Sequence, residues 1–193
     1  TAGSITLLLQ SLIPALIFSD KKLLLEIKGG TDVSFSPSID YMKNVFIPHI
    51  AKYFEKIDLR IMKRGYFPKG NGLVNLEIIP KKIVEALPVD LFEQGKIFQI
   101  KGISHASKDL EKANVAERQA DAARLLLKKY GDVNITSEYR ETLSTGSGIT
   151  LWALCSSNDE INVRNPVILG TDALGARGKS SESVGEECAK ALI

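Results

Sequence analysis

Hydrophobic positions along the chain change spacing from one segment to the next, which predicts a mixture of helices and strands. An apolar run opens the chain and favours a buried helix with Ser4 as its N-cap. A second helix holds Pro48, which we expect to kink it. The predicted order is helix, strand, helix, strand, strand. The elements are helices at Ile5–Phe18 and from Ser38 to about Phe54, and strands at Lys22–Lys28, Asp58–Phe67 and Leu73–Pro80.

A stretch without clear periodicity, Lys81–Gln94, separates this half from the next, and we place a domain boundary near residue 92. The second half is predicted to be a small sheet with two helices. In its first helix, small and apolar residues recur on one face, which indicates packing against the sheet. The elements are strands at Lys96–Ser104, Asn134–Glu141, Gly148–Ser156 and Val167–Asp172, and helices at Asn114–Tyr130 and from Ser181 to the end; the buried face is Ala116, Ala120, Ala123 and Leu127.

The dipeptide Asn71-Gly72 lies between two predicted strands of the first half. Asparagine and glycine are the residues that best tolerate the positive φ angles of a type I′ turn. We therefore predict a tight hairpin there.

Composition narrows the function only slightly. The chain has 193 residues, 44% of them hydrophobic and 25% charged, which is typical of a globular domain. With a formal net charge of only +2, the chain as a whole is not predicted to attract nucleic acid electrostatically. Any RNA contact would therefore be local. Cys155 and Cys188 lack metal-ligand spacing, which favours a reducing, cytoplasmic setting. The apolar run Ile5–Phe18 is too short to cross a bilayer, and no pattern indicates an oligomeric state.

Gln10 is the one long polar side chain within the first apolar run. Its amide could donate to and accept from a base edge simultaneously. Alternatively Thr6, Gln10 and Pro14 form a narrow stripe that faces solvent.

Two further segments have both a chemical and a structural interpretation. Gly29-Gly30-Thr31-Asp32 follows a strand and could bind a phosphate or its metal, or could be a plain turn. Pro37 and Tyr41 could flank a planar base, with Asp40 nearby. Asp40 could instead favour the dipole of the helix that starts there.

The chain has only two histidines. His49 follows Pro48 on a helix and is expected to be structural, and His105 is expected between a strand and a helix, so neither is favoured as a nucleophile. Cys155 is expected in the core. Arg177 and Lys179 could meet RNA phosphates or lie in a solvated loop.

Several segments in a fixed order resemble the RNA 3′-terminal phosphate cyclase family. The run Arg64–Gly72 is close to the family's Arg-Gly, Pro and triple-glycine signature, with Asn71 at the middle glycine. The other matching segments are Thr1–Ile5 with Gln10, Gly29–Asp32 with Pro37, Ser147–Ala153, and Leu174–Gly178 with Glu182.

The resemblance implies an α+β fold. Family members contain β-α-β-α-β-β repeat units, shared with enolpyruvyl transferases, and one repeat carries an inserted small domain of four strands and two helices. Residues 1–91 would be a partial cyclase core, one repeat lacking its first strand, and residues 92–193 the inserted small α+β domain. We expect the chain to be incomplete, without the N-terminal repeat and the C-terminal repeat.

The resemblance also implies a reaction. The family uses ATP and a divalent metal, Mg or Mn, to convert an RNA 3′-phosphate end to a 2′,3′-cyclic phosphate through protein-AMP and RNA-adenylate intermediates. Carried over by position, Gln10 and Pro37 would contact the nucleotide, with Asp40 and Tyr41 near the same pocket. The nucleophilic histidine is expected beyond Ile193, so this chain alone is expected to be inactive. Thr171 aligns where some relatives place an aromatic residue near the base.

Two alternatives stay open at this point. A non-catalytic relative that acts in ribosome assembly would keep the fold and lose pocket residues, and Asn71 and Thr171 could be such losses. An enolpyruvyl transferase would share the fold alone, and it predicts a cluster of basic residues that the sequence does not show.

Overall fold

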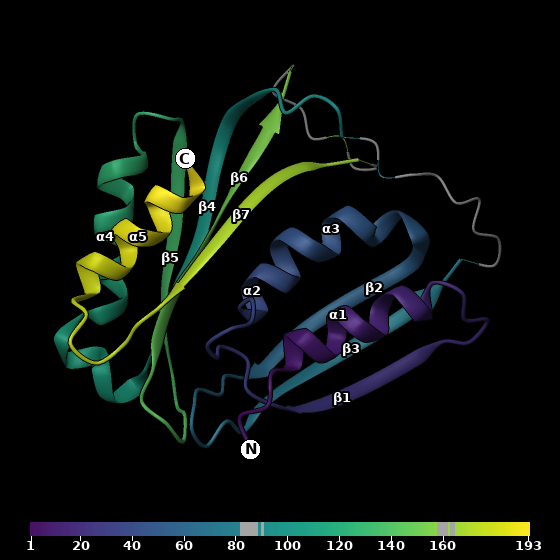
Figure 1. The fold of residues 1–193 in the computed structure, drawn as a ribbon, viewed down its shortest axis with the longest axis horizontal. Helices are drawn as coiled ribbons and strands as arrows, with labels where there is room; N and C mark the ends of the chain where they lie inside the picture. The colour runs from purple at the N-terminus through teal and green to yellow at the C-terminus, as the bar shows by residue number, and fades with distance from the viewer. Residues whose placement is uncertain (82–88, 90, 158–161, 163–164) are drawn as a thin grey trace.

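The structure is a computed structural model that describes residues 1–81, 89, 91–157, 162 and 165–193, and these fold into two β-sheets with helices packed against them (Figure 1). The fold is therefore α+β, as predicted. The strands are β1 (Leu23–Gly29), β2 (Phe54–Lys63), β3 (Gly72–Pro80), β4 (Lys96–Ser107), β5 (Asp132–Arg140), β6 (Ser147–Ser156) and β7 (Val167–Leu174). The helices are α1 (Ile5–Leu16), α2 (Ile39–Tyr41), α3 (Ile47–Ile50), α4 (Val115–Leu127) and α5 (Ser181–Leu192).

The first sheet is antiparallel with strand order β1-β3-β2, and the second has the order β5-β4-β6-β7. One face of the first sheet buries α1 and the segment from α2 to α3, through Leu9, Met42 and Leu76 among others. The opposite side of that helical segment contacts the second sheet, where Val45 packs against Trp152. The segment from α2 to α3 is therefore sandwiched between the two sheets (Figure 1).

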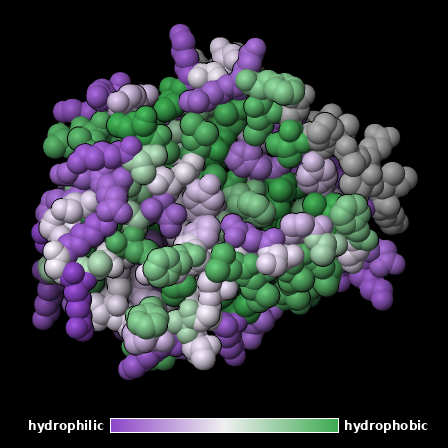
Figure 2. Space-filling model, viewed as in Figure 1, coloured by the Kyte–Doolittle hydropathy of each residue, from purple (hydrophilic) through white to green (hydrophobic). Residues whose placement is uncertain are grey.

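Helix α1 begins at the predicted cap, because the Leu7 N–H donates to Ser4 Oγ at 3.2 Å. The helix is only half-buried, however, since Leu7 and Leu8 are exposed. Figure 2 shows hydrophobic residues gathered over this helix. Thr6 is fully buried and donates to the Pro37 carbonyl oxygen at 2.8 Å. The alternative in which Thr6, Gln10 and Pro14 face solvent together is therefore wrong.

The second predicted helix is interrupted shortly before Pro48, which itself lies in α3. A π-helical turn, Met42–Phe46, joins α2 to α3, and a 3₁₀ turn, Ala51–Tyr53, follows. The Ile47 N–H donates to the Met42 carbonyl, five residues back rather than four. Such single π turns are a recognised cause of local bends in helices.

The predicted tight hairpin at Asn71-Gly72 is wrong. Gly72 already pairs with Gly29 as the first residue of β3, and β2 ends at Lys63. The positive φ angles fall one residue earlier, on Gly70 and Asn71, both at 65°. The connection is therefore an eight-residue loop, 64–71, which contains a cis Phe67–Pro68 bond. The loop is long because its residues bind the rest of the molecule instead of only turning the chain.

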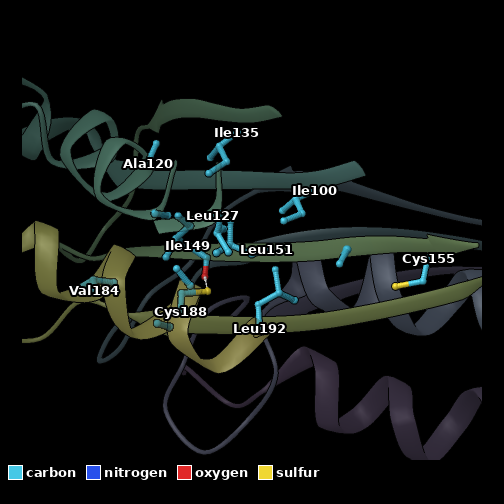
Figure 3. Packing of buried hydrophobic residues seen from close by; sticks show 14 residues of the cluster. Ile100, Ala120, Leu127, Ile135, Ile149, Leu151, Cys155, Val184, Cys188 and Leu192 are labelled. Carbon is cyan, nitrogen blue, oxygen red and sulfur yellow. Dashed lines mark hydrogen bonds between the residues drawn. The ribbon is translucent and has the colours of Figure 1, made fainter. Parts of the chain in front are cut away.

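The second sheet carries α4 and α5 on one face (Figure 3). Strands β4 and β5 are parallel and α4 connects them, whereas β4, β6 and β7 are antiparallel neighbours. The predicted apolar face of α4 is confirmed, because all four of its residues are fully buried. Cys155 is buried as predicted, and Cys188 lies in the same core. Strand β4 runs three residues further than predicted.

Two further predictions concern the domain boundary and membrane spans. The predicted boundary near residue 92 adjoins residues 82–88 and 90, which are outside the described part of the chain, so it stays a prediction. No helix in the described residues is long and apolar enough to cross a membrane.

Candidate functional site

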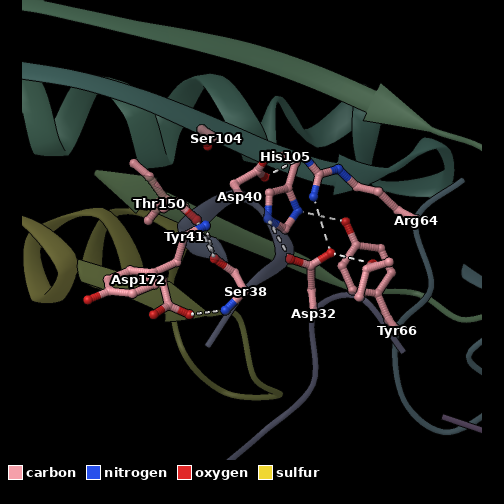
Figure 4. A network of polar contacts seen from close by, with 12 residues as sticks. Asp32, Ser38, Asp40, Tyr41, Arg64, Tyr66, Ser104, His105, Thr150 and Asp172 are labelled. Carbon is pink, nitrogen blue, oxygen red and sulfur yellow. Dashed lines mark hydrogen bonds and ion pairs between the residues drawn. The ribbon is translucent and has the colours of Figure 1, made fainter. Parts of the chain in front are cut away.

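A buried ionic cluster lies where the two sheets meet, and Arg64 is at its centre (Figure 4). The Arg64 side chain is 2% exposed. Its Nη1 lies 3.2 Å from Asp32 Oδ2 and its Nη2 lies 2.6 Å from Asp40 Oδ2. Its Nε donates to Glu138 Oε1 at 2.8 Å. Because Glu138 belongs to β5 and the other residues to the first half of the chain, the guanidinium group joins the two halves.

Arg64 and Glu138 keep their charges despite burial. Burial alone would lower the pKa of the Arg64 guanidinium, but the carboxylates of Asp40 and Asp32 raise it well above its usual value. Burial alone would likewise raise the pKa of Glu138, but Arg64 and Arg140 lower it to about 2. One cation thus contacts three carboxylates, which is the arrangement that a planar fork of five donors allows.

His105 lies in β4 and is fully buried, so its predicted position between a strand and a helix is wrong. Burial and the neighbouring Arg64 lower its pKa to about 3, and the imidazole is therefore neutral. Tyr66 Oη lies 2.8 Å from His105 Nδ1, and His105 Nε2 lies 3.5 Å from Asp32 Oδ1. Since burial raises the pKa of Tyr66, its hydroxyl stays protonated and donates to Nδ1. The ring proton then belongs on Nε2, which faces the Asp32 carboxylate.

Asp32, Asp40 and His105 bring three potential ligand atoms within 4.8 Å of one another. The arrangement nevertheless does not fit a divalent metal. The Arg64 guanidinium already bonds to both carboxylates from inside the cluster, and a metal there would be a second cation in direct repulsion with it. The cluster is therefore a self-contained ionic network.

The two glycine-containing motifs pack against each other. Thr31 Oγ1 accepts from the Gly65 N–H at 2.9 Å and donates to Asp32 Oδ2 at 2.6 Å. A Cβ atom on Gly65 would lie 2.2 Å from the Gly72 nitrogen, so only glycine fits there. The Gly30 and Thr31 N–H groups donate to the Gly3 and Gly65 carbonyls. These amides are therefore not free to hold a phosphate, and the turn interpretation of Gly29–Asp32 is favoured.

Gln10 and Pro37 lie on neighbouring segments. The bond from Thr6 to the Pro37 carbonyl holds α1 beside residue 37, and Gln10 follows one helical turn later on the same face. Both Gln10 and Pro37 are half-buried. Within the described residues, the Gln10 amide has no hydrogen-bond partner, so it is available to a ligand.

Asp40 contacts the ionic cluster, and Tyr41 contacts the second sheet. Asp40 is 1% exposed and is committed to Arg64. Tyr41 lies against β7, since a Cβ on Gly170 would lie 3.1 Å from Tyr41 Cε2. Burial, and then the nearby Asp172 carboxylate, raise the pKa of the Tyr41 phenol. The structure thus brings Gln10's helix to Pro37, places Asp40 in the ionic cluster and places Tyr41 at the second sheet.

A second polar contact between the halves escaped the sequence analysis. Ser38 Oγ lies 2.7 Å from Thr150 Oγ1 in β6, and the Ser38 N–H donates to Asp172 Oδ2 at 3.0 Å (Figure 4). Burial raises the pKa of Asp172. Thr150 is a polar residue inside an apolar strand. This is the one feature of the sequence that could have indicated the contact.

A family model described as RNA 3′-terminal phosphate cyclase matches residues 1–184. Proteins named RNA 3′-terminal phosphate cyclase are also similar to the whole chain. They include one from Ignicoccus hospitalis, 40% identical over 200 residues, one from Saccharolobus solfataricus, 42% identical over 197, and one from Pyrococcus furiosus, 41% identical over 194. The chain spans about half the length of these relatives, 53% in each case. This chain belongs to the RNA 3′-terminal phosphate cyclase family.

Proposed function

We propose that the protein converts an RNA 3′-phosphate end to a 2′,3′-cyclic phosphate at the expense of ATP, in a cytoplasmic setting. AMP would pass from ATP to the protein and then to the RNA 3′-phosphate, and the neighbouring 2′-hydroxyl would displace it. The observation that supports this proposal is the family match over residues 1–184, together with about 40% identity to the cyclase from Ignicoccus hospitalis over the whole chain.

Gln10 and Pro37 are the residues of this chain that best fit a role in binding ATP. The free amide of Gln10 offers a donor and an acceptor for polar atoms of the nucleotide. The half-exposed Pro37 ring provides a flat apolar surface for adenine. Asp40 would act indirectly, because its bond to Arg64 fixes the start of α2, next to Pro37. Tyr41 would border the same pocket from the side of β7.

The proposed mechanism needs a histidine that accepts AMP, and neither histidine of this chain is suitably placed. His105 is enclosed within the ionic cluster. His49 Nδ1 lies 2.6 Å from the Val45 carbonyl, which ties it to its own helix. We therefore propose that the nucleophile lies beyond Ile193. A divalent metal, Mg or Mn, would offset phosphate charge during the reaction, at a site other than the Asp32, Asp40 and His105 cluster.

The test is to incubate the full-length protein with ATP, Mg²⁺ or Mn²⁺ and an RNA that carries a 3′-phosphate. We expect a protein-AMP adduct and a cyclic RNA end, and the same RNA with a 3′-hydroxyl should not react. If neither adduct nor cyclic end forms with either metal, the proposal is wrong and a non-catalytic role becomes the better interpretation.

Substitution of Gln10 by alanine is expected to weaken ATP-dependent adenylation by roughly 1–3 kcal/mol, the usual effect of a lost polar contact. Folding should be unaffected, because the Gln10 amide has no partner among the described residues. Adduct formation at several ATP concentrations measures the change, and thermal unfolding tests the fold. Ser11→Ala, one residue along the same helix, is the matched control, since Ser11 is exposed and, among the described residues, its side chain bonds only to the Leu7 carbonyl. A Gln10 variant that melts early but adenylates normally would show a structural role instead.

A further inference from the structure

A cleft of about 810 Å³ lies beside the ionic cluster, between the two halves of the chain. One wall is the 64–71 loop, through Tyr66–Lys69, and the other is formed by segments of the second half. The second half contributes the loop before β6, the loop between β7 and α5, and Leu110, Val115 and Gln119 at and before the start of α4. The loop before β6 runs beside the 64–71 loop at the lower left of Figure 1. Tyr66 and Asp32, both part of the buried network, also line the cleft. The cleft is thus built by the contacts that join the two sheets.

The charges around this cleft favour an anion. Three cationic residues line it: Lys69 from one wall, and Arg177 and Lys179 from the other. Lys179 is ion-paired with Glu187, whereas no ion pair involving Lys69 or Arg177 occurs in the described part of the chain. The one acidic lining residue, Asp32, is buried and compensated by Arg64. The cleft therefore has a local positive charge although the whole chain is nearly neutral.

The rest of the lining favours a ligand with planar rings. Phe67 is 72% exposed at the rim, next to the exposed Pro68. An exposed aromatic face beside cations is the combination that binds unpaired bases and their phosphates. Deeper in the cleft, Gln119 is fully buried, and its Nε2 has no partner in the described residues. Because amide nitrogen and oxygen are assigned from their partners, Gln119 keeps one unpaired donor or acceptor beneath the lining of the cleft.

Hydrogen bonds fix the backbone of the two loops that carry Lys69 and Arg177. Its backbone N–H donates to Ser144 Oγ at 3.0 Å, so the 64–71 loop is tied to the opposite wall. The Gly175 N–H donates to the Ser147 carbonyl at 2.9 Å, which anchors the loop that carries Arg177. Both loops therefore present their cations from hydrogen-bonded backbone, which reduces the entropy cost of binding.

We propose that this cleft binds a single-stranded segment of the RNA substrate, with phosphates at Lys69 and Arg177 and a base against Phe67. The inference rests on the proposed function and extends it. It assigns RNA recognition to the junction between the halves and separates it from the ATP contacts at Gln10 and Pro37. Single-stranded RNA fits better than duplex because an exposed aromatic face needs an unstacked base.

The test uses the full-length protein and a fluorescent single-stranded RNA with a 3′-phosphate. The double variant Lys69→Gln/Arg177→Gln should weaken RNA affinity about tenfold or more, and it should lower the magnitude of the slope of log K against log salt by about 1.4, as two lost phosphate contacts predict. Phe67→Ala should weaken affinity but keep the salt slope. Lys128→Gln, an exposed lysine at the end of α4 outside the cleft, and Phe18→Ala, an exposed aromatic residue elsewhere, are the matched controls.

A parallel measurement of the protein-AMP adduct, formed from ATP without RNA, separates the two proposals. We expect the cleft variants to adenylate like the wild type. If they bind RNA as tightly as the controls while the wild type still cyclises RNA, the cleft assignment is wrong and the proposed function stands. If they lose adenylation but not RNA affinity, the cleft belongs to ATP, which also overturns the assignment. If wild-type protein binds no RNA and forms no adduct, both proposals fail.

Discussion

Replacement of Arg64 by methionine is expected to destabilise the protein by roughly 3–5 kcal/mol, the usual cost of removing one partner from a buried ion pair. The substitution leaves Asp32 and Asp40 buried without their cation, although the volume of the side chain is nearly kept. Chemical denaturation monitored by circular dichroism measures the loss. Arg64→Lys should also destabilise, because one compact ammonium nitrogen cannot reach three carboxylates that contact three separate nitrogens of the guanidinium.

Arg60→Met is the matched control, since it removes the same charge from β2, four residues before Arg64. Arg60 is exposed and pairs with Asp58 at the surface, so its loss should change the free energy of unfolding by less than about 1 kcal/mol. Equal effects of the two substitutions would contradict the view that the buried cluster holds the halves together.

Acidification from pH 7.5 to pH 4 is expected to reduce the free energy of unfolding by about 3 kcal/mol through His105 alone. The pKa of His105 falls from 6.5 to about 3 on folding. Below pH 6.5 the unfolded chain therefore binds a proton that the folded chain excludes, and stability falls as the pH falls, by about 1.4 kcal/mol per pH unit. The loss ends near pH 3, where the folded protein also becomes protonated. Denaturation curves at half-unit pH steps measure this slope.

Two variants separate His105 from the carboxylates. His105→Gln should abolish the slope between pH 6.5 and pH 5, whatever its effect on absolute stability. Glu138→Gln should keep that slope and reduce the dependence below pH 4.5, because the pKa of Glu138 is lowered from 4.5 to about 2 in the folded state. A His105→Gln protein with an unchanged slope would show that another group is responsible.

The elements of the fold were largely predictable because each depends on local pattern. The Ser4 cap, the strand at β1 and the apolar face of α4 follow from spacing over a few residues. The Asn71-Gly72 hairpin failed for a reason outside local pattern. Gly72 belongs to strand β3 because it pairs with Gly29, forty-three positions earlier in the chain. The turn therefore lies before Gly72.

The site was less predictable because it consists of pairings between distant segments. Nothing in the local sequence around Arg64 indicates that its partners are Asp32, Asp40 and Glu138, and His105 looked like a loop residue because β4 extends further than its apolar pattern. The resemblance to the cyclase family supplied Gln10 and Pro37. The resemblance also pointed to the run Arg64–Gly72. In the structure, this run packs against Gly29–Asp32 and supplies the central cation of the ionic cluster.

The contacts of the Arg64 guanidinium group also make the two halves of the chain depend on each other. The four-stranded sheet with α4 and α5 looks like an exchangeable unit, but it supplies Glu138 and His105 to the cluster. A chain from which that unit was deleted would expose a cluster built to be buried and would remove a carboxylate partner of Arg64. If this unit is moved from one relative into another, the cluster can form only when the protein that receives it has matching residues on its side of the junction. The cluster residues of the two halves must therefore be exchanged together.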